Sequence, residues 1–230
     1  MPRAASRPTR AGVAIVVMLA LAMIAPLPAS AASQVRTSGP RSTRAVALTF
    51  DDGIRRSVCA RIARTLRAHG AKGTFFINGV NLRRRPARWR RILRGHAIAN
   101  HTLSHVDLSR ASAATIRAQI SQNEALHERL LRRKMLKILR PPYGAYDSLV
   151  RTVAGQLGYR WTVLWNVDTL DWSYSATAAG IISRATGARP GSVILMHCSR
   201  RVTADALPAI IRHYKRRGIK LLGIRRVLDL

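Results

Sequence analysis

The sequence predicts an α/β fold in which parallel strands alternate with helices. Three observations support this: short β-rich runs alternate with stretches of helical hydrophobic period, polar residues follow where several runs end, and 47% of the 230 residues are hydrophobic. Alternating strands and helices are typical of βα units around a parallel sheet. A chain of this length and composition can bury one sizeable core, so we expect one globular domain.

Seven short, β-rich runs are predicted to be strands. Along the chain they are Ala45–Phe50, Gly73–Asn78, Ala97–Asn100, Leu136–Leu139, Arg160–Asn166, Ser192–Met196 and Ile219–Leu222. Between the first two runs, Ser57–His69 has apolar residues at helical spacing, and Gly70 follows as a stop signal. Ser112–Arg133 is the longest stretch of helical period.

The N-terminal residues 1–32 are predicted to be a cleaved secretory signal peptide. Three arginines precede an uncharged apolar run, and small residues at 28–32 match a signal-peptidase site. An uncleaved membrane anchor is the alternative, because about 17 apolar residues is the lower limit for a spanning helix. The small residues favour cleavage, which would leave an exported protein without a transmembrane segment.

The remaining chain is predicted to consist of a linker and a domain. Residues 33–44 are polar and show no apolar period, so we expect a polar linker there and a folded domain over 45–230.

The charge balance predicts an anionic partner. The formal net charge is +30, from 40 Lys and Arg residues against 10 Asp and Glu residues. A surface with this excess carries a strong positive field. The run Arg83–Arg91 combines arginines with a tryptophan, a pattern that can track a polyanion, but a solvated helix face explains it equally well.

Two adjacent carboxylates end the first predicted strand. Asp51 and Asp52 follow its apolar run directly, and Gly53 comes next. Neighbouring acids repel each other, and a metal ion or a shared proton would relieve the repulsion. Asp-Asp-Gly is also a common turn sequence, so the pair alone does not decide between a functional site and a turn.

Two histidines follow the third predicted strand in the motif H-T-L-S-H. On a helical turn, the spacing of His101 and His105 would place both imidazoles on one face. Two imidazoles and one carboxylate make a catalytic metal site with an open position. The alternative is that one histidine caps a helix and the other is a satisfied polar group, since motifs this short often match by chance.

Three further segments carry polar residues after predicted strands. Arg140 opens the rigid sequence R-P-P-Y-G, Asp168 and Asp171-Trp172 follow the fifth strand, and His197 follows the sixth. Taken singly, these residues are compatible with a proline turn, a core tryptophan and a structural histidine. In barrels of parallel strands, however, the carboxyl ends of the strands carry the chemistry.

In this order, the five segments resemble the motifs of the polysaccharide deacetylase family, the NodB-homology domains of carbohydrate esterase family four. The similar segments are Thr49–Gly53, His101–His105, Arg140–Tyr143, Asp168–Trp172 and Leu195–His197. The resemblance runs from about Ala45 to the C-terminus. Each motif is short, but the ordered set is specific. The resemblance implies a distorted (β/α)7 barrel of parallel strands, and a doubly wound open sheet is the alternative.

The resemblance also implies a metal centre and a general base. Asp52, His101 and His105 would bind a divalent metal, usually Zn²⁺ in this family, with Co²⁺ and others as substitutes. Asp51 would be the general base, and Arg140 would pair with it and keep it ionised.

The other implied roles concern the acetyl group and the leaving amine. The backbone N–H of Tyr143 would meet the oxyanion. His197 would protonate the amine, with Asp168 as the partner that orients its imidazole. Trp172 would line the pocket around the acetyl methyl, and Asp171 is taken as structural.

The implied function is N-deacetylation of an amino-sugar polymer such as peptidoglycan or chitin by a secreted or cell-wall-associated enzyme. An anionic cell envelope would attract it, and no specific nucleic acid is expected. One alternative is an O-acetyl esterase acting on a xylan-like polysaccharide. The other is a cationic wall-binding or nucleic-acid-binding protein without catalysis, which would leave five complete motifs unexplained.

Two positions depart from the family pattern, where many relatives have Pro and an acid but this chain has Ile54 and Cys198. Neither position is among the central catalytic groups of the family. Cys59 and Cys198 follow the first and fifth motifs, so barrel closure would bring both near the same end of the sheet. We therefore predict that they form a disulfide.

Overall fold

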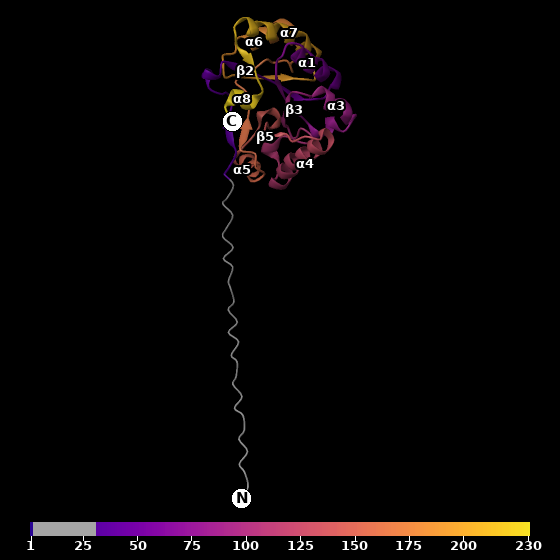
Figure 1. Ribbon diagram of the computed structural model, residues 1–230, viewed down its shortest axis with the longest axis vertical. Coiled ribbons are helices and arrows are strands. Elements are labelled where there is room, and N and C mark those ends of the chain that lie inside the picture. The colour runs from indigo at the N-terminus through magenta and orange to yellow at the C-terminus, as the bar shows by residue number, and fades with distance from the viewer. Residues whose placement is uncertain (2–30) are drawn as a thin grey trace.

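The structure, a computed structural model, describes Met1 and residues 31–230 (Figure 1). The predicted signal peptide therefore lies almost wholly outside the described residues. Within the described part of the chain, no helix combines the length and the apolar character needed to cross a membrane.

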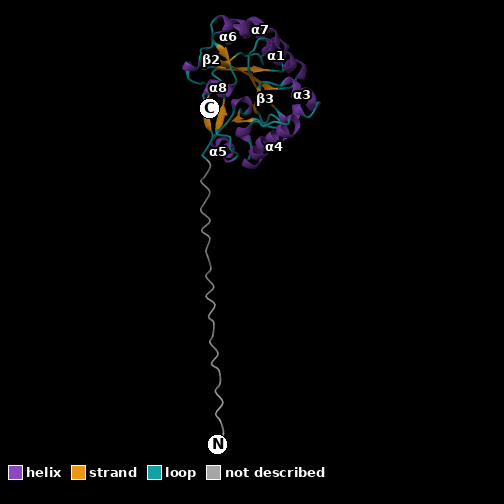
Figure 2. Ribbon diagram, viewed as in Figure 1, coloured by secondary structure: helices purple, strands orange, loops and turns teal. Residues whose placement is uncertain are grey.

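The described chain forms one curled sheet of nine parallel strands with helices around its outside (Figure 2). The strands are β1 (Gln34–Arg36), β2 (Ala45–Asp52), β3 (Gly73–Ile77), β4 (Ala97–Asn100), β5 (Leu136–Leu139), β6 (Trp161–Val163), β7 (Val167–Asp168), β8 (Val193–His197) and β9 (Lys220–Leu221). The helices are α1 (Arg56–Ala68), α2 (Gly79–Leu82), α3 (Pro86–Ile92), α4 (Ala113–Leu131), α5 (Ser148–Gln156), α6 (Ala178–Thr186), α7 (Arg201–Arg216) and α8 (Ile224–Leu228).

The strand order identifies the sheet as an incomplete barrel. The order is β1-β6-β5-β4-β3-β2-β8-β7, with β9 paired to the start of β2. From β2 to β6 each strand joins the sheet beside its predecessor, and β8 returns to the other side of β2. A doubly wound sheet would instead reverse the direction of growth after its first half. The predicted distorted barrel is therefore confirmed, and the open-sheet alternative is not.

The alternation of side chains along β2 separates two hydrophobic clusters. Ala45 and Ala47 face the interior of the barrel, where Phe76 of β3 and residues of α8 complete a buried cluster. Val46, Leu48 and their neighbours face outward, where α1, α3, α6 and α7 cover the sheet. Because side chains alternate along a strand, Thr49 and Asp51 also point inward. Helix α8 closes the opposite end of this interior from Asp51.

The predicted polar linker is wrong in part, because residues 33–36 belong to the folded domain. β1 pairs with β6, and the buried hydroxyl of Ser33 forms a 2.8 Å hydrogen bond with Thr162 Oγ1. An edge strand of three residues has too few inward positions to show an apolar period, which is why the sequence did not reveal it.

The predicted strand over Arg160–Asn166 is also wrong in part. Only Trp161–Val163 is a strand, and Val167–Asp168 forms a separate strand against β8. The guanidinium of Arg140 donates hydrogen bonds to the carbonyl oxygens of Val163 and Leu164. These oxygens are therefore not paired with a neighbouring strand of the described chain, and β6 ends at Val163. The β4 and β5 strands have the predicted bounds.

Candidate active site

The two adjacent carboxylates lie at the carboxyl end of β2, as predicted. Asp51 and Asp52 are 2% and 8% exposed. Asp51 follows the inward alternation of the strand, whereas Asp52 has a φ of 71°, which turns its side chain out of that alternation. Gly53 continues with a φ of 82°, and a Cβ there would lie 2.8 Å from Ile77 Cγ2. The narrow turn therefore requires glycine.

Asp51 is paired with a completely buried arginine. Arg140 follows β5 and donates a 2.8 Å hydrogen bond from one terminal nitrogen to Asp51 Oδ1 and another to Thr49 Oγ1. Its other nitrogens donate to the carbonyl oxygens of Val163 and Leu164. A buried charge is tolerated where it is paired and fully hydrogen-bonded, and this pair meets both conditions. Arg140 thus fixes the orientation of Asp51 from across the barrel.

The histidine motif forms a loop rather than the predicted helical turn. Thr102 and His105 both have positive φ angles, of 67° and 62°. The Asn100 side chain accepts a hydrogen bond from the backbone N–H of Thr102, and the Thr102 hydroxyl accepts one from that of His105. These local bonds compete with a helix and tighten the loop. The loop nevertheless presents both imidazoles to one carboxylate.

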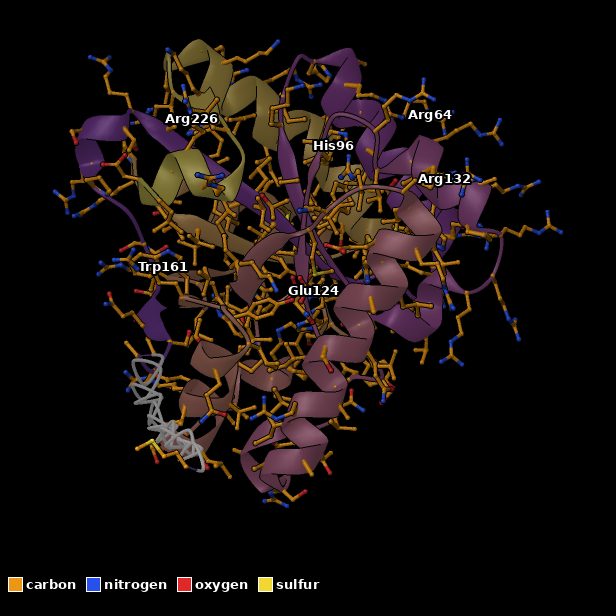
Figure 3. The ribbon with its side chains drawn as sticks, turned by 60° about the horizontal axis from the view of Figure 1, so that its bottom comes forward. Arg64, His96, Glu124, Arg132, Trp161 and Arg226 are labelled. Atoms are coloured by element: carbon orange, nitrogen blue, oxygen red, sulfur yellow. A yellow bond between two sulfur atoms is a disulfide. The ribbon has the colours of Figure 1, made fainter. Side chains whose placement is uncertain are left out.

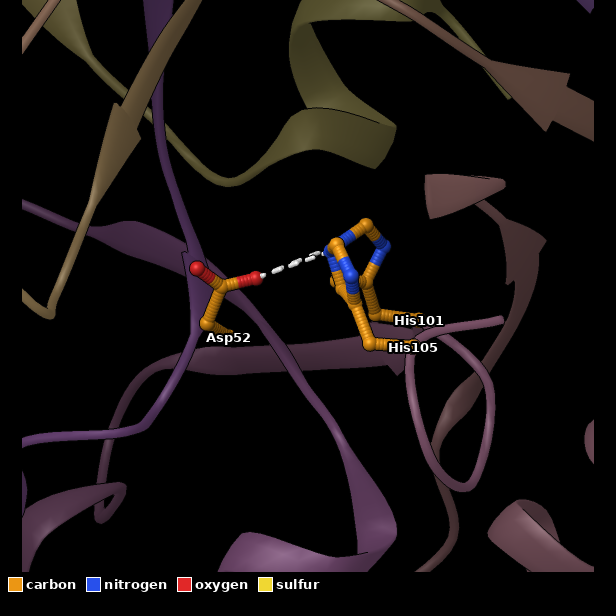
Figure 4. Close-up of side chains that lie close together, drawn as sticks. All are labelled: Asp52, His101 and His105. Carbon is orange, nitrogen blue, oxygen red and sulfur yellow. Dashed lines mark ion pairs between the residues drawn. The ribbon is translucent and has the colours of Figure 1, made fainter. Parts of the chain in front are cut away.

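Asp52, His101 and His105 form a cluster of three ligand-type groups (Figure 4). Their ligand atoms all lie within 4.8 Å of one another, and Asp52 Oδ1 is 3.5 Å from His101 Nε2 and 3.3 Å from His105 Nε2. Buried Asp52 Oδ1 has no hydrogen-bond partner among the described residues. One orphaned carboxylate oxygen and two imidazole nitrogens are the donor set of a catalytic zinc site with an open position. The residues therefore fit a divalent metal.

Contacts around this cluster prepare it for a cation. His101 Nδ1 is 2.7 Å from the carbonyl oxygen of Arg140, which can only accept, so Nδ1 carries the proton and Nε2 is free to bind. Burial alone would raise the pKa of Asp52, but the nearby imidazoles of His101 and His105 hold it well below the usual value. Asp52 is thus a carboxylate, the form that binds metal.

His197 ends β8 directly beside β2, where it is paired in register with Asp51. Its Nδ1 lies 2.8 Å from Asp171 Oδ1, and its backbone N–H donates to Asp171 Oδ2 at 2.7 Å. Burial would lower the pKa of His197, but the hydrogen bond and charge of Asp171, with the charges of Asp51 and Asp52, raise it to about 9. The imidazolium is therefore the stable form at neutral pH, with Nε2 as the remaining donor.

The predicted pairing of Asp168 with His197 is wrong, because Asp171 occupies that place. Asp171 is completely buried and also accepts a hydrogen bond from the Thr203 hydroxyl. Asp168 instead accepts from the backbone N–H of Leu170 and, at 3.3 Å, from the indole of Trp172. Leu170 has a φ of 54°, and this turn carries Asp171 inward and Asp168 toward the rim.

The two predicted substrate-binding aromatics lie on the surface. Tyr143 is 70% exposed, has a φ of 60°, and meets the ring of His105 edge-on at 4.7 Å between centroids. Trp172 is 55% exposed and is held by its indole N–H to Asp168. Tyr143 therefore borders the metal-ligand cluster, and Trp172 follows directly on Asp171.

The predicted disulfide between Cys59 and Cys198 is confirmed by an S–S bond. Cys59 lies in α1 and Cys198 directly follows His197, so the bond ties the helix after the first motif to the end of β8. The backbone N–H of Cys198 also donates to the carbonyl oxygen of Asp51. Asp51 and His197 are thus both tied to the short segment that carries Cys198.

Sequence comparison identifies the family. Residues 38–162 match the Polysaccharide deacetylase family. The chain is 36% identical over 193 residues to a peptidoglycan-N-acetylglucosamine deacetylase of Bacillus cereus, covering 81% of this chain and 69% of the relative. It is also 36% identical over 151 residues to a chitooligosaccharide deacetylase of Azorhizobium caulinodans, covering 65% of this chain and 71% of the relative.

Solved structures show the same fold. The peptidoglycan N-acetylglucosamine deacetylase Bc1960, crystallised with a naphthalenyl-N-oxidanyl-benzamide, superposes with a TM-score of 0.78 at 34% identity, covering 85% of this chain and 92% of that one. The wild-type CE4 family pseudoenzyme BA3943 from Bacillus anthracis superposes with a TM-score of 0.80 at 25% identity, covering 86% and 70%. The fold alone therefore does not establish catalysis, which depends on the side chains present at the site.

These matches define the class as a carbohydrate-active α/β barrel of the NodB-homology type. The chain belongs to the polysaccharide deacetylase family, and the predicted family and fold are confirmed.

Proposed function

We propose that this chain is a secreted, metal-dependent N-deacetylase of amino-sugar polymers, with peptidoglycan as the leading substrate class. One observation carries the proposal: Asp51 and His197, a carboxylate and an imidazolium, lie in register on neighbouring strands beside the cluster of Asp52, His101 and His105. Hydrolysis of an amide needs a base for water, an acid for the amine and stabilisation of the oxyanion. This one site contains groups suited to all three.

Asp52, His101 and His105 would hold the metal, with Zn²⁺ favoured by the donor set and Co²⁺ as a substitute. When bound, a divalent cation lowers the pKa of water and polarises the acetyl carbonyl. Arg140 neutralises the buried charge of Asp51 and keeps one of its oxygens occupied, which leaves Oδ2 as the base.

The proton transfers follow from the positions of the two paired residues. Asp51 takes a proton from the attacking water as the oxygen adds to the acetyl carbon. The backbone N–H of Tyr143 is proposed to donate to the oxyanion, and Trp172 to flank the acetyl group. His197 then donates its Nε2 proton to the nitrogen, the C–N bond breaks, and a free amine and acetic acid leave. The acid ionises to acetate, and the protons from it and from Asp51 go to His197 and to solvent, which restores the imidazolium and the carboxylate. Asp171 stabilises the imidazolium before this transfer.

The export and location of the protein are further parts of the proposal. The apolar run and small-residue site of the N-terminus support secretion, and the disulfide suits an oxidising compartment. Figure 3 shows Arg64 and Arg132 directed outward on one side of the molecule, in keeping with a charge of +30. We propose that this charge draws the protein to an anionic envelope. Retention on cell-wall fragments that does not weaken with added salt would contradict this.

The test of the function is metal removal and replacement. Chelation should abolish release of acetate from an acetylated amino-sugar polymer, and Zn²⁺ or Co²⁺ should restore it. Elemental analysis should find about one divalent metal per chain, and His101→Ala or His105→Ala should lower both metal content and rate. Full activity in a metal-free preparation would overturn the proposed mechanism.

A further inference from the structure

Four exposed arginines lie on loops at the same end of the barrel as the candidate active site. Arg55 follows the turn after β2, and Arg83, Arg84 and Arg85 follow α2, the short helix after β3. We call this group the basic rim. Neighbouring parallel strands end at the same edge of a sheet, and β2 and β3 pair up to Asp52 and Ile77. Both loops therefore flank the metal-ligand cluster.

The basic rim is anchored directly to a proposed metal ligand. The carbonyl oxygen of Asp52 accepts hydrogen bonds from the backbone N–H of Asn78 and, at 2.9 Å, from the side chain of Asn81. The carbonyl oxygen of Asn81 in turn accepts from the indole of Trp89, which is buried beneath Gly53. Arg83, Arg84 and Arg85 thus lie between Asn81 and Trp89, and both of these residues are fixed to the site.

The positive charge of the basic rim is not balanced by the protein. Residues 53–106 contain no Asp or Glu. Among the ion pairs of residues 31–230, none involves an arginine of the basic rim. The Arg56 guanidinium instead donates to the carbonyl oxygen of Arg84, which adds another charge to the same loop. Like charges held together repel, and an anion between them would relieve that repulsion.

The acids of the active site do not cancel this field. Asp51 is paired with Arg140, Asp171 is paired with His197, and Asp52 is placed to bind a cation. Asp51 and Asp171 therefore face positive partners within the site, and a bound divalent metal would give Asp52 one. Asp168 is on the side of β7 and β8, away from the loops after β2 and β3. A substrate that approaches the mouth of the barrel meets a net positive potential on the side of β2 and β3.

We infer that the basic rim selects glycans that carry carboxylates near the acetylated sugar, such as peptide-substituted peptidoglycan strands, over neutral chitin-type polymers. This inference rests on the proposed N-deacetylase function and names the substrate class for that site. Guanidinium groups match carboxylates in a two-pronged hydrogen-bonding geometry, and the exposed positions let a flexible peptide reach them. A neutral polymer has no carboxylates and forms no ion pairs with these arginines.

The experiment compares two substrates with the same number of sugars, a chitin tetramer and a peptidoglycan tetrasaccharide with its stem peptides. The rim variant combines Arg55→Gln, Arg83→Gln and Arg84→Gln, and leaves Arg85 because its φ is 60°. The control variant combines Arg212→Gln, Arg216→Gln and Arg217→Gln, which remove the same charge from the C-terminal end of α7. That end leads into β9, which pairs with the first residues of β2, so it lies opposite the site.

The ratio of kcat/KM between the charged and the neutral substrate should fall about tenfold in the rim variant, mostly through KM of the charged substrate. The control variant should keep the ratio of the unmodified protein, and kcat/KM for the chitin tetramer should stay within about twofold in both variants. Raising the salt concentration should reduce the ratio of the unmodified protein toward that of the rim variant.

Three outcomes would overturn the inference. The first is an unchanged ratio of kcat/KM between the charged and the neutral substrate in the rim variant. If that variant also loses retention on a phosphate-rich wall polymer, the arginines bind the wall and not the substrate. Equal losses on both substrates would assign the arginines to the architecture of the site, and an equal fall in the control variant would assign selectivity to overall charge. Absence of acetate release from either substrate by the unmodified, metal-loaded protein would instead refute the proposed function itself, together with this inference.

Discussion

At the scale of single residues, the division between Asp168 and Asp171 shows how backbone geometry assigns a role. Both acids follow a predicted strand, and only three positions separate them. The positive φ of Leu170 turns the chain so that Asp171 is buried against His197, while Asp168 holds the indole of Trp172. Sequence spacing does not contain that turn, since Leu rarely adopts a left-handed conformation.

His197→Ala tests the role of the imidazole as the general acid. An amide nitrogen leaves poorly unless it is protonated, whereas the phenolate of an activated acetate ester leaves without help. The variant should lose about 10²- to 10⁴-fold in N-deacetylation while it keeps its metal and much of its ester hydrolysis. Rates on both substrates and metal content should be measured together. Loss of the metal would make His197 a ligand, and equal loss on both substrates would exclude the general-acid role.

Asp171→Asn tests the cause of the raised pKa of His197. Activity should fall as the pH rises through this pKa, because a general acid must be protonated before it donates. The variant removes the negative charge of Asp171, one of the causes that raise the pKa of His197 to about 9, so the alkaline limb of its pH–rate profile should lie at lower pH than that of the unmodified protein under the same metal load. Asp168→Asn is the matched control and should leave the alkaline limb of the pH–rate profile at the same pH. The assignment fails if Asp168→Asn shifts the limb and Asp171→Asn does not.

At the scale of elements, the loop between β4 and α4 positions two proposed metal ligands through one buried side chain. Asn100 accepts hydrogen bonds from Thr102 and Asn123 and donates to the carbonyl oxygen of Ile120 and the hydroxyl of Tyr159. The side chain is completely buried. It therefore links the loop to α4 and to Tyr159, two residues before β6, and the loop geometry depends on contacts distant in sequence.

Asn100→Ala should weaken metal binding about 10- to 100-fold, the usual cost of removing a group that orients metal ligands. Loss of the amide frees the backbone of Thr102 and leaves buried donors without partners. Competition with a chromophoric chelator would measure the affinity, and circular dichroism would confirm folding. Gln122→Ala, on the exposed face of α4, is the control and should bind metal normally. Unchanged affinity in a folded Asn100→Ala protein would show that the loop is rigid without this contact.

The sequence predicted the elements whose signals are local and missed those set by tertiary contacts. Strands β2 to β5 and β8 are predicted by the sequence because each contains a short, mostly apolar, β-rich run. β1 escaped because an edge strand of three residues has no period, and β7 because the ladder is broken by the Arg140 guanidinium. The spacing of His101 and His105 matches a helical turn, but the backbone hydrogen bonds of Thr102 and His105 that form the loop instead leave no signal in the spacing.

At the scale of the whole molecule, the barrel brings residues from distant parts of the chain to one end. Asp51 and Arg140 are 89 residues apart, His197 and Asp171 are 26 apart, and the disulfide joins positions 139 apart. The sequence motifs identify the candidate acids, histidines and arginine, and the resemblance to the family implies a role for each. Only the curled sheet shows that they meet, and that the acid-free loops after β2 and β3 surround the same site.

The site of Asp51, Asp52, His101, His105 and His197 is proposed to release acetate from the amino sugars of a wall polymer. Mass spectrometry of peptidoglycan fragments, chitin oligomers and acetylated xylan, incubated separately with the zinc-loaded protein, tests it directly. We expect free amines on the amino sugars of peptidoglycan, and no such product from the Asp51→Asn protein even though that variant keeps its metal. Unchanged amino sugars together with loss of O-acetyl groups from xylan would contradict it and identify an esterase.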